Sequence, residues 1–347
     1  MNTTVETRAK YYSMNWMRVL AFVFIIVYHY MVELELRGNY NFHESSIYYM
    51  NNNFHIAILG VSMFFMISGA GLMLSSRKHW DIKEFYRKRF TKLLIPFYIV
   101  ELIALLFTYS FHSDWIAGFT FYNKRYLIFN LLGMDGYFEQ YMDTFSLHVG
   151  EWFLGALIML YVVFPIFRYF MEKNRYITIV VATIYYLVLV YSNIIPESPW
   201  TNVFVKAYDF ILGMFLIIEL PRILSRKKLR LALLVITLGL IVFAISYTGI
   251  LATPMVINNL VLALSFFVFF FTLEDIIAKA AWANKGIDWI CGISYEIFLV
   301  HHVIIYFFGD IIKGQLMPIT RIGLILMCEI IVMIAFALLV KAINPKR

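Results

Sequence analysis

Ten separate runs of apolar residues, each long enough to cross a lipid bilayer, constrain this chain more than any other feature of its sequence. A bilayer core is about 30 Å thick, and a helix needs roughly 20 apolar residues to cross it. Inside lipid the backbone must satisfy its own polar groups, so each run is expected to be helical. The sequence therefore predicts an all-α integral membrane protein, a bundle of about ten transmembrane helices. The runs lie near residues 14–33, 54–75, 93–110, 148–167, 176–193, 202–220, 231–249, 255–273, 289–308 and 319–340.

The composition supports a membrane protein. The 347 residues are 62% hydrophobic and only 15% charged, whereas a soluble domain is about 45–50% apolar and about 25% charged. The sequence has no internal repeat, low-complexity tract or soluble segment, so we expect residues 1–347 to form a single transmembrane domain. The first run carries Arg18 and His29 and ends without a small-residue cleavage site, which favours a retained helix over a signal peptide.

The basic residues predict how the chain is oriented. With the N-terminus in the cytoplasm, 23 Lys and Arg residues fall in cytoplasmic loops and ends, against 6 on the outer side. Cytoplasmic loops carry an excess of these residues, so both termini are expected in the cytoplasm. The charges stand in short bursts between apolar runs and form no basic stripe. The net charge of +7 therefore anchors loops, and we expect no nucleic-acid partner.

The two cysteines and the histidine spacing give no sign of a metal site. Cys291 and Cys328 lie inside apolar runs, and no Cys-x-x-Cys or Cys/His zinc spacing is present. The cysteines are interpreted as small core residues, and the sequence predicts no metal cofactor.

Arg18 and His29 are the first candidate functional pair. Ionisable side chains inside a membrane cost free energy and by default mark function. The two stand eleven residues apart, which puts them within about 20° on one helix face and about 16 Å apart along its axis. Arg18 would meet a phosphate near the cytoplasm, and His29 would transfer protons deeper in the helix. The alternative is a snorkelling arginine and a hydrogen-bonded core histidine.

A cytoplasmic basic run is the second candidate. Arg89 and Lys92 are three residues apart and share a helix face ahead of Pro96, which starts or kinks the third predicted helix. Such a pair can hold a pyrophosphate. A basic run beside a membrane is also a common topology anchor or contact for anionic lipid.

The third candidate group lies near the C-terminus. Ser294 and His301 are seven residues apart on one face of the ninth predicted helix, whereas His302 points about 100° away. A Ser–His covalent pair is disfavoured, because two helical turns separate the residues by about 10 Å. His148 and Glu151, three residues apart at the start of the fourth predicted helix, are interpreted as satisfied polar contacts rather than catalysts, as are Asp209 and Glu101.

Taken in chain order, these motifs resemble the acyltransferase 3 family of membrane O-acyltransferases. The match spans residues 14 to about 310, and the joint order of the motifs is more specific than any one of them. Two positions depart from the family pattern: Lys92 replaces the second arginine of Arg-x-x-Arg, and Leu157 replaces a glutamate. The matching residues are Arg18 and His29, then Phe64, Phe65, Ser68 and Gly69, then Arg89, Lys92 and Pro96, then Trp152 to Pro165, and finally Gly292 to His301.

The resemblance implies a function. Its bacterial surface-glycan branch implies acetyl-CoA or another acyl-CoA as donor, approached from the cytoplasm. It implies a sugar hydroxyl of a lipid-linked or surface polysaccharide as acceptor, in the bacterial plasma membrane. Arg18, Arg89 and Lys92 would hold the donor phosphates, and His29, assisted by His301, would take the hydroxyl proton or help acyl passage. Direct transfer and a covalent acyl-enzyme both stay open at this stage.

Two other functions fit a helical membrane bundle. A transporter or flippase also carries buried charges, but often shows paired broken helices in two halves, and the sequence has no such pairing. A non-catalytic assembly protein would tolerate the loss of His29.

Overall fold

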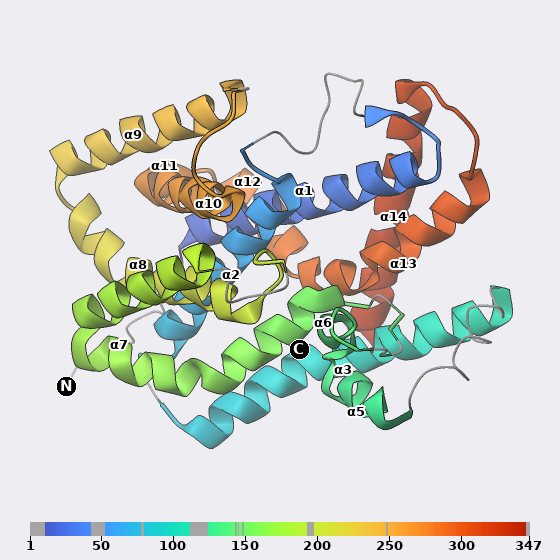
Figure 1. The fold of residues 1–347 in the computed structure, drawn as a ribbon, viewed down its shortest axis with the longest axis horizontal. Coiled ribbons are helices and arrows are strands. Elements are labelled where there is room, and N and C mark those ends of the chain that lie inside the picture. Colours follow the sequence, from blue (N-terminus) through green and yellow to red (C-terminus); the bar gives the residue numbers. More distant parts are fainter. Residues whose placement is uncertain are drawn as a thin grey trace.

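The computed structural model describes residues 11–42, 53–77, 80–111, 124–142, 144, 146–147, 149–192, 198–247 and 249–344. Within these residues the chain forms thirteen α-helices and one short 3-10 helix (Figure 1). Seven of the described helices are long and apolar enough to cross a membrane. The predicted all-α membrane fold is therefore confirmed, and the protein is a multi-pass membrane protein. The cytoplasmic position of both termini stays a prediction.

All ten apolar runs fall on helices. The seven candidate spans are α1 (Tyr12–Leu36), α2 (Ile56–Ser75), α7 (Glu151–Tyr191), α9 (Lys227–Ser246), α10 (Met255–Thr272), α13 (Ser294–Ile312) and α14 (Ile319–Ile343). The remaining elements are α3 (Ile82–Phe111), η3 (Lys124–Tyr126), α5 (Leu127–Leu132), α6 (Asp135–Phe138), α8 (Val203–Leu224), α11 (Glu274–Lys279) and α12 (Ala281–Cys291).

Several helices differ from the simple pattern of one run per span. The 41-residue α7 carries two runs and breaks at Asn174, where the backbone is extended. The Asn174 side chain then accepts a hydrogen bond from the backbone N–H of Ile177 and caps the second half. The run predicted over 289–308 begins too early, because a turn after Cys291 separates α12 from α13. The runs over 93–110 and 202–220 lie on α3 and α8, which are not among the seven candidate spans.

Helix α1 lies at the centre of the bundle, and its position sets that of His29. It packs against α2, α10, α11, α12 and α13 (Figure 1). At its N-terminus, the backbone N–H groups of Tyr12 and Ser13 donate to the carboxylate of Glu274 at 2.9 and 2.8 Å. A carboxylate stabilises a helix N-terminus because it satisfies orphan donors and complements the helix dipole.

The C-terminal end of α1 is also fixed. Tyr30 donates a hydrogen bond from its hydroxyl to the carbonyl of Ile322 in α14. Arg37, just past the helix, forms ion pairs with Glu33 and with Asp310 of α13. Contacts at both ends thus limit the rotation and sliding of α1, and with it the movement of the side chains on its inner face.

Helices α2 and α8 cross through glycines. A Cβ atom at Gly69 would fall on the carbonyl oxygen of Phe210, and one at Gly213 would fall on the carbonyl oxygen of Met66. Small residues allow helix backbones to approach closely in membranes, and Gly69 and Gly213 do so here. Beside this crossing, Lys206 donates to Ser62 and pairs with Asp209, so this charge pair is buried and satisfied.

Candidate active site

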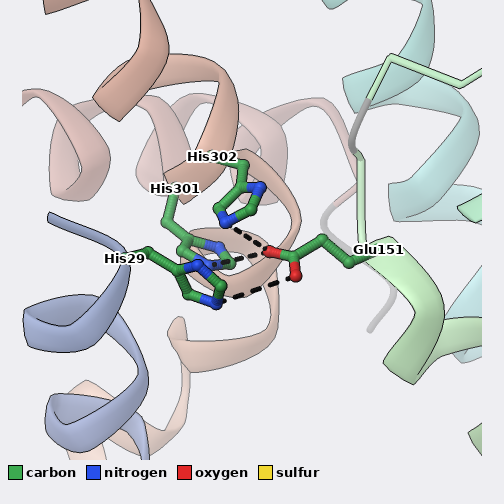
Figure 2. A group of neighbouring side chains, drawn as sticks. All are labelled: His29, Glu151, His301 and His302. Carbon is green, nitrogen blue, oxygen red and sulfur yellow. Dashed lines mark ion pairs between the residues drawn. The ribbon is translucent and has the colours of Figure 1, made fainter. Parts of the chain in front are cut away.

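Four side chains from three helices converge in the interior and form what we call the histidine cluster: His29 of α1, Glu151 of α7, and His301 and His302 of α13 (Figure 2). Around the carboxylate of Glu151, His302 Nε2 lies 2.9 Å and His301 Nε2 3.3 Å from Oε1. His29 Nε2 lies 3.7 Å from the other oxygen, Oε2. The predicted residues His29 and His301 are therefore neighbours in space, although they are 272 positions apart in the sequence.

The backbone at Glu151 is strained. Gly150 has φ 77° and Glu151 has φ 46°, so two consecutive residues adopt left-handed conformations where α7 begins. A non-glycine residue in this region is uncommon and costs roughly 1–3 kcal/mol, and such strain concentrates at functional sites. The strained turn is held from one side by α6, because a Cβ at Gly136 would come within 2.7 Å of the Glu151 backbone.

The tautomer of His301 follows from its surroundings. Its Nδ1 lies 2.6 Å from the backbone carbonyl oxygen of Phe298. A carbonyl oxygen only accepts hydrogen bonds, so Nδ1 carries a proton and donates it. In neutral His301 the other nitrogen, Nε2, therefore presents a lone pair to the cluster. A backbone carbonyl that fixes one imidazole nitrogen in this way orients the ring for proton transfer or for metal binding.

The arrangement supports two kinds of chemistry. Imidazoles beside a carboxylate can accept and return protons. The four side chains also offer donor atoms that all lie within 4.8 Å of one another, so they can hold a metal ion. The expectation of no metal came from the lack of a local ligand spacing, and this cluster is assembled from three distant segments of the chain.

Arg18 and Arg89 are connected through one residue of α7. Both are in electrostatic contact with the buried Tyr161 of α7, which also shares a hydrogen bond with Ser68. Arg18 donates to Asn15 Oδ1, and Asn15 in turn donates to Asp288. Both predicted donor-binding arginines thus act on the same buried tyrosine. Along the axis of α1, Arg18 lies about 16 Å from His29.

A third arginine joins this region. Arg89 donates to the hydroxyl of Ser75, and Arg168 of α7 donates to the hydroxyl of the next residue, Ser76. The Arg168 guanidinium also lies over the ring of Trp80, 4.4 Å from its centroid. Lys92, the other predicted member of the pair, is exposed on α3.

Sequence reasoning undervalued Glu151 and His302. Glu151 was interpreted as a satisfied polar contact, and His148, paired with it, lies outside the described residues. His302 points away from the Ser294–His301 face, as expected, but that direction leads to Glu151. Two consecutive histidines inside an apolar run were the sequence signal that could have identified His302 as a site residue. Ser294 instead donates to the carbonyl of Cys291 at the start of α13, in line with the low weight given to a Ser–His pair.

A large apolar cavity lies away from the cluster. It has a volume of about 850 Å³ and lies between the two halves of α7 and α8, where Met159, Phe170, Tyr185 and Ile211 are among its lining residues. No cluster residue lines it, so the polar chemistry of the protein and this apolar space are separate features.

Comparison with known proteins identifies one family. The model of a family described as an acyltransferase domain, acyltransferase 3, matches residues 11–341. No curated protein and no solved structure matches the chain. The matched region includes every residue of the histidine cluster and all three arginines described above.

Proposed function

The chain belongs to the acyltransferase 3 family and is a membrane acyltransferase; from this premise we propose that it transfers an acetyl group from cytoplasmic acetyl-CoA to a hydroxyl of an envelope glycan. The acceptor is a lipid-linked or surface polysaccharide, capsular or exopolysaccharide, of the bacterial plasma membrane. The observation that carries the proposal is the histidine cluster, with imidazoles around one carboxylate inside a membrane bundle.

The donor binds at the arginine end. Arg18 and Arg89 approach one region of the bundle, and Arg168 adds a third guanidinium beside Arg89. Guanidinium groups recognise phosphate oxygens with paired hydrogen bonds. Lys92, exposed nearby on α3, adds positive charge for the same phosphates. The pantetheine arm of coenzyme A is a long, thin chain, which extends from the phosphates toward His29 along α1.

Transfer takes place at the cluster. The acceptor hydroxyl oxygen attacks the carbonyl carbon of the thioester, the new C–O bond forms as the C–S bond breaks, and the thiolate of coenzyme A leaves. His29 Nε2 takes the hydroxyl proton and returns it to the thiolate. Glu151 lies 3.7 Å from His29 and stabilises the imidazolium that forms. His301, oriented by the backbone carbonyl of Phe298, lies 3.3 Å from Glu151 and completes the cluster around the reacting groups.

The first test uses membranes from cells that express the chain, incubated with acetyl-labelled acetyl-CoA and lipid-linked glycans of the host. We compare the wild type, His29→Ala and His55→Gln at matched expression. His55 is a buried histidine outside the cluster, so its variant controls for the loss of a buried imidazole. Label is expected to enter glycan with the wild type and the His55 variant, and to fall by roughly 10²- to 10⁴-fold with His29→Ala.

Other outcomes revise the proposal in defined ways. Label that enters glycan equally with His29→Ala would remove His29 as the base and keep the enzyme. Label in a small molecule instead of glycan would replace the acceptor. The absence of transfer with several acyl-CoA donors, together with movement of a glycan-lipid across the membrane, would favour a flippase.

A further inference from the structure

One contact in the histidine cluster is unfavourable unless a positive charge lies within it. The Nδ1 proton of His301 is donated to Phe298, so the Nε2 of neutral His301 holds a lone pair. That lone pair faces Glu151 Oε1, itself an acceptor, at 3.3 Å. Within the described part of the chain, neither atom forms a hydrogen bond of good geometry, although His302 Nε2 also lies 2.9 Å from the same carboxylate oxygen. Two facing acceptors in a buried site repel each other, so a cation between them is favoured.

Two spacings between the donor atoms match those of a metal coordination shell, and all the donor atoms lie within 4.8 Å of one another. Zinc binds histidine nitrogen and carboxylate oxygen at about 2.0–2.2 Å, so two of its ligand atoms are at most about 4 Å apart. The nitrogens of His301 and His302 lie 3.3 and 2.9 Å from Glu151 Oε1. These contacts fit one ion bound on the side where all three donors converge.

The three donors also differ from His29 in exposure. The side chains of His301, His302 and Glu151 are 1%, 8% and 13% exposed, whereas that of His29 is 20% exposed and contacts the other carboxylate oxygen, at the longest of the distances. Two histidines and one glutamate are a ligand set of catalytic zinc sites, which keep a further position open for water or substrate.

We propose that His301, His302 and Glu151 bind one divalent transition-metal ion, with His29 beside its open position as the base rather than as a ligand. The ion is zinc or a similar divalent transition metal, because imidazole ligands suit these metals. Bound there, the ion would polarise the thioester carbonyl oxygen. This last role rests on the proposed function, whereas the binding itself does not.

The test measures metal directly. The full chain, carrying an affinity tag without histidines, is purified in detergent, stripped with a chelator and titrated with Co²⁺, whose visible absorption reports coordination. Wild type, His29→Ala and the control His55→Gln are each expected to take up about one Co²⁺ per chain. Glu151→Gln and His302→Gln are expected to lose that uptake.

A further variant keeps the proposal falsifiable if the glutamine variants fold poorly. His302→Cys supplies a thiolate in place of the imidazole, and is expected to retain Co²⁺ and to add a thiolate-to-cobalt charge-transfer band in the near ultraviolet. Wild type that takes up no more Co²⁺ than His302→Gln, or His302→Cys without the new band, would overturn the metal site.

The outcomes separate the two proposals. If metal binds but no acyl transfer occurs, the metal site is supported and the proposed function is refuted. Transfer that survives complete chelation, with no metal uptake by the wild type, would refute the site and leave a cluster held together by a protonated histidine.

Discussion

At the scale of single residues, Glu151 links the three histidines of the cluster. It is the common neighbour of His29, His301 and His302, and its own backbone is held in a left-handed conformation. That strain is tolerated because Gly136 of α6 packs directly against it. A carboxylate that served only to satisfy one polar contact would not need such a constrained position.

Replacing Glu151 by glutamine tests this role. The amide keeps the shape of the side chain and removes its charge, so it no longer stabilises an imidazolium. We expect acetyl transfer to fall roughly 10²- to 10⁴-fold in turnover, with little change in the KM for acetyl-CoA. Steady-state transfer in membranes measures both. The control is Glu329→Gln, which converts a different buried carboxyl, on α14, to an amide and should keep wild-type turnover. Equal turnover for Glu151→Gln and wild type would rule out Glu151 as the group that stabilises the imidazolium.

The limits of sequence reasoning are clearest at this same residue. Arg18 and His29 were identified because they share one helix face, a relation that a sequence contains in full. His301 was identified from its place in a family motif. Glu151 and His302 gained their importance from α7 and α13 packing against each other and against α1, and no local spacing reports such contacts. Arg168 escaped notice for the same reason, since its partners Ser76 and Trp80 lie far away in sequence.

At the scale of elements, the α2–α8 crossing depends on the absence of two side chains. Gly213→Val would place atoms on the Met66 carbonyl oxygen and push the helices apart. We expect a loss of about 1–3 kcal/mol or more, as in other overpacked interiors. Gly239→Val on α9 is the matched control, because a Cβ there has no described atom within 4 Å. Gel filtration after graded heating in detergent compares them, and equal melting of the two variants would contradict the packing argument.

The short helix α6 adds a pH dependence. Burial raises the pKa of Asp135 to about 7, although a hydrogen bond from Ser146 opposes the shift and the nearby Glu139 carboxylate adds to it. An unfolded aspartate titrates near about 3.9. The folded protein therefore holds this proton more tightly, so the contribution of Asp135 to stability is complete below about pH 4 and is lost as pH rises through about 7.

Asp135→Asn removes that titration. We expect thermal stability in detergent to fall from pH 5 to pH 8 in the wild type, and to fall less in Asp135→Asn. Melting curves over this pH range measure it. A wild-type profile that rises with pH, or one that the substitution leaves unchanged, would contradict a proton held by the buried Asp135.

At the scale of the whole molecule, hydropathy was sufficient to predict the helical class and the approximate positions of the long helices. It failed where the length of a run and the length of a helix differ. The break at Asn174 lies inside a continuous helical assignment, and the turn after Cys291 interrupts a run that composition alone presents as unbroken. Local backbone geometry and tertiary contacts decide such positions, and they do not alter mean apolarity.

The orientation of the bundle decides whether donor and acceptor ends lie as proposed. With both termini in the cytoplasm, the turn between α8 and α9 faces the cytoplasm and the segment between α9 and α10 faces outward. In a chain with Cys291→Ala and Cys328→Ala, Thr253→Cys should react with a membrane-impermeant maleimide in intact cells. Ser225→Cys should react only after lysis, since both positions are exposed in the structure. The reverse labelling pattern would put Arg18 and Arg89 on the outer side, out of reach of cytoplasmic acetyl-CoA, and the proposed direction of transfer would then be wrong.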